Sequence, residues 1–122
     1  MSVKRKDVFK YAEESYGTTP EYLWEKTPDA AVLRNTRNKK WYGLVMNVRK
    51  SVIGLDGEGC VDILNIKCSP TVREVLIVES KAIPAYHMNK RLWISVILDK
   101  ISEQEMRGVL DESYNLINRW YL

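Results

Sequence analysis

The sequence predicts an α+β domain in which helices pack against one face of an antiparallel β-sheet. Three strand-like segments come first as a group and a helical segment then separates them from the rest, so strands and helices do not alternate as a parallel sheet requires. A chain of 122 residues with 45% hydrophobic residues is long enough to bury one core without disulfides or a structural metal. We therefore expect residues 1–122 to form a single domain.

The first expected helix begins after Ser2, a residue type that caps helices, and runs to about Tyr16. Its apolar residues recur at helical spacing, and Gly17 supplies the stop signal. A proline-punctuated connecting segment follows and contains Trp24. This side chain can plug the edge of the core or lie over a groove, and we expect it to plug the core.

Two strands, 30–35 and 41–50, flank a short polar loop and predict a β-hairpin. Alternation within the second strand places Tyr42 on the face of Leu44 and Trp41 on the opposite face. One face of this strand is therefore expected to be largely apolar and the other mixed.

A glycine-rich turn at 54–59 leads into a third strand at 60–68. The glycines do not predict a phosphate-binding loop, because a strand follows them and no helix N-terminus meets a phosphate there. Cys60 and Cys68 lie at opposite ends of this strand, about 25 Å apart at about 3.3 Å per residue, which is too far for a disulfide. We expect two buried thiols rather than a redox pair.

Ser69 followed by a proline is a strong helix start, so we expect a helix to about Ser80 although 75–78 is also rich in β-formers. A loop at 82–92 then precedes a strand at 93–98.

The last expected helix opens with Ser102 and Glu105, which match the S-x-x-E capping box. An apolar stripe marks one face of it and continues to Trp120 and Tyr121. This helix should close the core.

The net charge of +3 is too small to indicate a nucleic-acid partner by itself. The distribution of charge is more informative, because no acidic residue lies between Asp29 and Asp56. The cations of this segment are Arg34, Arg37, Lys39, Lys40, Arg49 and Lys50. The last helix instead carries several acidic residues, so we expect one basic end and one acidic helix.

The inventory of reactive side chains is small. One histidine and two cysteines cannot close a zinc site at this spacing, so we expect no metal and no cofactor. A hydrolytic triad would need His87 as its base, but the chain has no Gly-x-Ser-x-Gly elbow, and we expect no enzymatic activity. We expect His87 and Asn89 to fix the turn before Trp93 through bonds to backbone groups.

No stretch of the sequence predicts contact with a membrane. No run approaches the roughly 18 apolar residues of a spanning helix, and the N-terminus leads into a charged helical pattern instead of an apolar signal core. These features predict a cytoplasmic protein.

Two sequence blocks carry recognisable motifs. One is the helix start Lys-Cys-Ser-Pro at 67–70, and the other is His-Met-Asn-Lys-Arg-Leu-Trp at 87–93. The signature residues of the second block are His87, Asn89, Lys90 and Trp93. Together the blocks resemble the MmcQ/YjbR family of small bacterial proteins, over most of the chain from Trp41 at least to Tyr114. The resemblance implies the element order α-β-β-β-α-β-β-α, with a further strand in 82–86, and a fold similar to type III secretion chaperones and to a double-wing DNA-binding domain.

The same resemblance implies DNA binding, because the fold is likened to that double-wing domain. Cationic loops can track a phosphate backbone while neighbouring aromatic rings stack on bases. The expected nucleic-acid contacts are Arg34, Arg37, Lys39, Lys40, Asn89, Lys90 and Arg91. The alternative is a protein-interaction or chaperone-like module, in which the exposed sheet face presents Trp41, Tyr42 and Trp93 to a partner chain or a second copy. A third alternative places His87, Asn89 and Lys90 in the anion pocket of an enzyme.

Overall fold

The computed structural model describes residues 3–86 and 88–118. Five strands form one antiparallel sheet in the order β1-β2-β3-β5-β4. The elements are α1 (Arg5–Tyr16), β1 (Ala31–Arg34), β2 (Trp41–Arg49), the 3-10 helix η1 (Lys50–Ile53), β3 (Cys60–Lys67), α2 (Pro70–Val78), β4 (Ala82–Pro84), β5 (Trp93–Ile97), the 3-10 helix η2 (Leu98–Lys100) and α3 (Glu103–Asn118). The predicted α+β class and the element order α-β-β-β-α-β-β-α are therefore confirmed.

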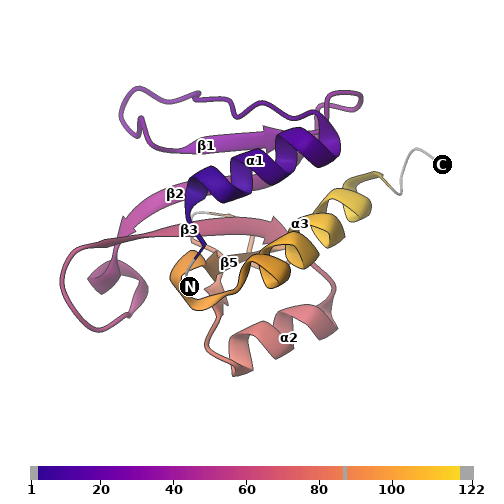
Figure 1. The fold of residues 1–122 in the computed structure, drawn as a ribbon. Helices are drawn as coiled ribbons and strands as arrows, with labels where there is room; N and C mark the ends of the chain where they lie inside the picture. The colour runs from indigo at the N-terminus through magenta and orange to yellow at the C-terminus, as the bar shows by residue number, and fades with distance from the viewer. Residues whose placement is uncertain (1–2, 87, 119–122) are drawn as a thin grey trace.

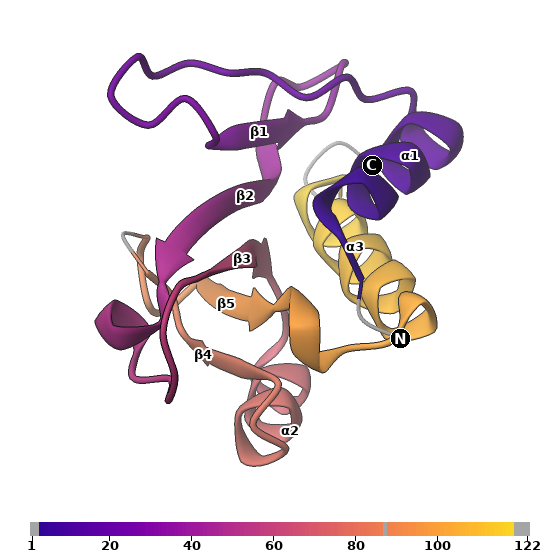
Figure 2. The same cartoon turned by 60° about the vertical axis from the view of Figure 1, so that its left-hand side comes forward.

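The helices lie on one side of the sheet. Figures 1 and 2 show α1 and α3 next to each other across the same face, and Figure 2 shows α2 beside the edge strand β4. Their apolar side chains and those of the strands form one large buried cluster. Its members include Val8, Ala12, Leu33, Val45, Leu64, Leu76, Ile94, Val96, Met106 and Leu110.

Local signals set most of the helix ends. Ser69 Oγ accepts a hydrogen bond from the Val72 N–H at 3.3 Å and starts α2. At the start of α3, the Ser102 N–H donates to the Glu105 carboxylate at 3.0 Å, and the Glu105 N–H donates to Ser102 Oγ at 3.1 Å. These are the two hydrogen bonds of the predicted capping box. The β-rich segment 75–78 is helical, and β4 forms where the family resemblance places an additional strand.

The start of α1 differs from the prediction. The helix begins at Arg5, because the carboxylate of Asp7 accepts the backbone N–H of Lys4 at 2.9 Å and caps the first turn from within the helix. Ser2, the predicted cap, lies outside the described residues. The predicted stop is confirmed, since Gly17 adopts a left-handed backbone with φ of 67°.

A β-bulge changes the predicted face of Tyr42. The pairing of β1 with β2 shifts between Leu33, which pairs with Gly43, and Arg34, which pairs with Trp41, so Tyr42 is the additional residue of the bulge. Tyr42 is fully buried in the helix-side cluster instead of lying with Leu44 on the other face. The alternation rule was wrong here because a bulge re-aims one side chain.

The second face of the sheet is also largely covered. One small cluster there gathers apolar side chains of β2, β3 and β5 with residues from the turn after η1, and another receives Met88 from the loop before β5. Between them, Asn65 and Ser95 are fully buried and bonded to each other, and Ser95 Oγ accepts the Tyr86 N–H at 2.8 Å. This face is therefore not the bare sheet that the protein-partner alternative requires.

Two further side chains differ from their predicted environments. Trp24 is 39% exposed and meets Trp41 edge to face at 5.8 Å on the surface, so it does not plug the core. Cys60 is exposed because it is the first residue of β3, directly after the exposed glycine turn, whereas Cys68 is half-buried. Both cysteines are free thiols.

Across the described ranges, no helix combines the length and apolarity that crossing a membrane requires.

Candidate nucleic-acid interface

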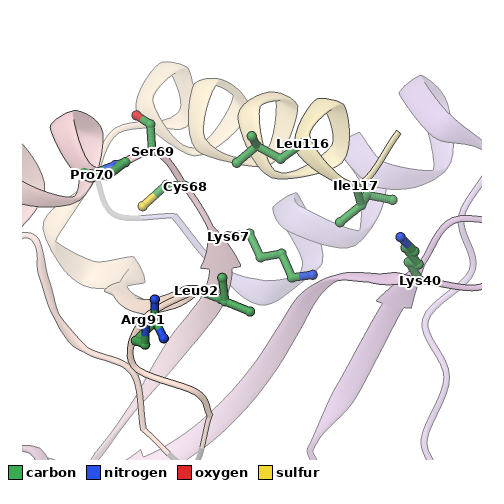
Figure 3. Close-up of a pocket in the computed structure, with 9 residues that line it drawn as sticks. All are labelled: Lys40, Lys67, Cys68, Ser69, Pro70, Arg91, Leu92, Leu116 and Ile117. Atoms are coloured by element: carbon green, nitrogen blue, oxygen red, sulfur yellow. The ribbon is translucent and has the colours of Figure 1, made fainter. Parts of the chain in front are cut away.

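A pocket of about 540 Å³ lies where the end of β3 meets the last turns of α3 and the loop before β5 (Figure 3). Three of its lining residues are cations that come from different segments. Lys40 comes from the hairpin loop, Lys67 from the end of β3 and Arg91 from the loop before β5. The other lining residues are Cys68, Ser69, Pro70, Leu92, Leu116 and Ile117.

Lys67 is the central cation of this pocket. Its ammonium lies 5.4 Å from the centre of the Trp93 ring, which gives it a cation–π contact. Burial, and then the charge of Lys40, lower its pKa below the ordinary value. Within 3–86 and 88–118, no carboxylate forms an ion pair with Lys67. An anion in the pocket would therefore stabilise the charged form of this side chain.

The backbone of Lys67 is held by α3. Its N–H donates to Ser113 Oγ at 2.9 Å, and the same hydroxyl donates to the Tyr42 carbonyl at 2.6 Å. The register of β2 with β3 starts at Gly43 and Ile66, so Ser113 bridges the two strands where their own pairing has ended. One buried hydroxyl thus satisfies two backbone groups beside the pocket.

Two asparagines organise the basic hairpin loop. Asn35 Oδ1 accepts the Arg37 N–H at 2.7 Å, and Asn38 Oδ1 accepts the Lys40 N–H at 2.9 Å. Their amide nitrogens donate to groups at the end of α3, at 2.6 and 3.2 Å. The loop is therefore fixed internally and tied to the helix that lines the pocket. Neither asparagine was predicted to have this role, although asparagine in a tight polar loop is a signal for such bonds.

The predicted hairpin cations fall into two groups. Arg37 and Lys39 are exposed in the loop, where Lys39 adopts a positive φ of 65°, and Lys40 reaches the pocket. Arg34 instead forms an ion pair with Glu21 at 2.9 Å and lines a separate hollow with it. Its charge is therefore largely neutralised locally.

In the loop before β5, some of the predicted residues hold the loop together and others face the pocket. Asn89 fixes the turn as predicted, since its Oδ1 accepts the Arg91 N–H at 2.9 Å and its carbonyl accepts the Trp93 N–H at 3.0 Å. The ammonium of Lys90 donates a hydrogen bond to the Ala85 carbonyl at 3.0 Å. Arg91 is exposed and lines the pocket. His87, the other residue predicted to fix this turn, lies outside the described residues.

Comparison with known proteins identifies the family. The family model described as YjbR matches residues 13–116. The chain belongs to the YjbR family. An uncharacterised protein of Bacillus subtilis, YyaQ, is 48% identical over 113 residues, which cover 92% of this chain and 96% of that protein.

Solved structures share this YjbR fold. A protein from Pseudomonas syringae, 36% identical, superposes with a TM-score of 0.87 in its crystal structure, over 93% of this chain and 98% of that one. Its solution NMR structure gives a TM-score of 0.82 over 93% and 92%. The Deinococcus radiodurans protein DR2400 has a TM-score of 0.72 at 20% identity, over 95% of this chain and 79% of that chain, which shows a likeness of fold alone.

The aromatic residues of this YjbR domain do not form the expected patch. Tyr42 is fully buried and Trp93 is 6% exposed. Three exposed large apolar side chains lie together in the segment before β1, at Tyr22, Leu23 and Trp24, and others lie at Val52, Val75, Val78 and Leu92. The exposed apolar residues are therefore outside the sheet face.

Acidic, histidine and cysteine side chains offer no metal site in the part of the chain that the structure describes. There, no three of them lie close enough together to hold an ion. The pocket is distinguished by its cations.

Proposed function

We propose that the protein binds DNA through a basic surface made of the hairpin loop and the pocket beside it. The observation that supports this most strongly is the convergence of Lys40, Lys67 and Arg91 from three separate segments (Figure 3). Arg37 and Lys39 extend the same charge along the exposed loop. Cations grouped in this way neutralise neighbouring phosphates and release counterions, whatever the base sequence.

The fixed hairpin loop favours such binding. Because Asn35 and Asn38 tie the loop to itself and to the end of α3, the backbone that carries the cations does not have to be ordered when a ligand arrives. Pre-ordered groups lose less conformational entropy on association. The surface is therefore suited to sequence-tolerant contact with the duplex backbone.

The test is a titration with duplex DNA at several salt concentrations. If about four phosphates are contacted, the slope of log affinity against log salt should be about −3.6. Changing Arg37, Lys39 and Lys40 together to glutamate should weaken binding to every duplex and flatten this slope. The fold should survive, because Arg37 and Lys39 are exposed and such loop charges usually change stability by less than about 0.5 kcal/mol each.

A control reverses two charges at the other end of the sheet, a change of −4 compared with −6 in the triple variant. Arg49 and Lys100 are exposed, and Arg49 pairs with Cys60, at the opposite end of β3 from Lys67. The double variant Arg49→Glu, Lys100→Glu should keep most of the affinity and the slope. No retention of DNA by the parent at low salt, or equal loss in both variants, would refute the proposal and turn attention to Tyr22, Leu23 and Trp24 as a protein contact.

A further inference from the structure

The pocket has a property that contact with a phosphate backbone does not use. Its walls include the apolar side chains of Pro70, Leu92, Leu116 and Ile117, which come from three segments. A volume of about 540 Å³ lies within the range of roughly 300–1,000 Å³ that is typical of small-molecule sites. A duplex backbone running over the surface would leave this apolar interior unfilled.

The three cations line the same cavity as those walls. Figure 3 shows Lys67 between Arg91 on one side and Lys40 on the other, with Leu116 and Ile117 across from them. Lys67 and Arg91 form no ion pair with any carboxylate of the described residues. Three cations around one cavity match a dianion better than a monoanion, because each added charge strengthens the attraction at close range.

The carboxylate of Glu112 lies near the pocket but is bonded to Ser69. Glu112 accepts hydrogen bonds from the backbone and the hydroxyl of Ser69, both at 3.4 Å. It therefore supports the start of α2 and does not neutralise Lys67.

We propose that the pocket binds a small phosphate monoester whose organic part is apolar, such as an aryl or alkyl phosphate. The dianionic phosphate lies among Lys40, Lys67 and Arg91, and the apolar part lies against Leu92 and α3. Arg91 donates through its planar fork, which suits phosphate oxygens. The inference goes beyond DNA binding, because it depends on the apolar walls as well as on the charge.

The test is isothermal titration of the full chain with phenyl phosphate, compared with inorganic phosphate and with benzyl alcohol. Phenyl phosphate should bind with one site per chain, and each comparison compound should bind at least about tenfold more weakly, since each lacks one half of the recognised chemistry. Amide shifts in NMR spectra should change at Lys67, Leu92 and Leu116, which locates the site.

Variants separate charge from apolar contact. Lys67→Met keeps the length of the side chain, removes the ammonium and should weaken phenyl phosphate by about tenfold or more. Leu92→Ser removes an exposed apolar wall and should weaken phenyl phosphate while leaving inorganic phosphate unchanged. The control Lys100→Met removes an exposed charge at the far end of the sheet and should have no effect. If Lys67→Met does not fold, Arg91→Gln tests the same charge from an exposed position.

Binding of phenyl phosphate can be tested separately from binding of DNA. A double variant Arg37→Glu, Lys39→Glu alters the loop outside the pocket, so it should weaken DNA but change phenyl phosphate by less than about threefold, which is under 1 kcal/mol. Absence of saturable phenyl phosphate binding at millimolar concentration, equal binding of inorganic phosphate, or unchanged affinity in Lys67→Met and Arg91→Gln would each overturn the inference.

Discussion

Ser113→Ala is expected to destabilise the protein far more than the loss of one oxygen atom suggests. Ser113 is fully buried on α3, and its hydroxyl bridges the Lys67 N–H and the Tyr42 carbonyl at 2.9 and 2.6 Å. These groups lie where β2 and β3 have separated, so no backbone partner of the other strand replaces the hydroxyl. The alanine variant leaves a partly buried donor and a buried acceptor without their partner.

The size of the effect follows from these two groups. An unsatisfied buried polar group costs about 1–3 kcal/mol, and serine to alanine within a helix returns about 0.5 kcal/mol of helix propensity. Two such groups cost about 2–6 kcal/mol, so a net loss of about 1.5–5.5 kcal/mol is expected. For a domain of this size, roughly 4 °C per kcal/mol converts the loss to a fall in Tm of roughly 6–22 °C.

The assay is urea and thermal unfolding of the parent, of Ser113→Ala and of Asn115→Ala. Asn115 is exposed on the same helix, so its variant measures the gain in helix propensity without a buried bond. A loss below about 0.5 kcal/mol in Ser113→Ala, relative to this control, would show that the two backbone groups find other partners and would refute the reasoning.

Three further outcomes are expected. Iodoacetamide at pH 8 should modify exposed Cys60 well before Cys68, because burial raises the pKa of the Cys68 thiol to about 11; peptide mapping that shows equal rates would contradict this. Although burial favours the neutral acid, hydrogen bonds from Arg5 hold the pKa of Asp62 below its ordinary value. Asp62 therefore stabilises the fold above its unfolded pKa of about 4, and this contribution is lost as pH falls through the lower folded pKa, so Asp62→Asn should show a smaller stability difference between pH 7 and pH 3 than the parent. Gly43→Ala should cost about 1 kcal/mol in urea unfolding, because its Cβ would lie 3.0 Å from the Cδ1 of Leu33, which is fully buried and has little room to move, and an unchanged midpoint would argue against this contact.

Signals that act within one turn of chain were predictable from the sequence. The starts of α2 and α3 follow from Ser69 and from the pair Ser102 and Glu105, and the end of α1 follows from Gly17. Each signal satisfies backbone groups only three or four residues away, so it does not depend on the rest of the fold. The cap of α1 was missed because Asp7 supplies it from inside the helix.

Features that depend on strand pairing were not predictable in the same way. The place of Tyr42 depends on a shift in register between β1 and β2, which alternation along one strand cannot reveal. The pocket depends on β3 pairing with β5 across α2 and β4, which brings Lys67 next to Arg91. Lys40 and Arg91 were predicted from the sequence as separate cationic contacts. Lys67, which lies between them in the pocket, was not predicted. Neutralisation of Arg34 by Glu21 was also not predicted.

The attachment of the hairpin loop to α3 has a consequence for synthesis of the chain. Asn35 and Asn38 leave the ribosome early, but their partners at the end of α3 emerge only after every strand has been translated. Until then the loop has only its internal bonds, and the pocket lacks its α3 wall. Because domains generally fold as units during translation, the attachment of the hairpin to α3 forms only after the strands have been made. Completion of this surface is therefore a late event in the folding of the nascent domain.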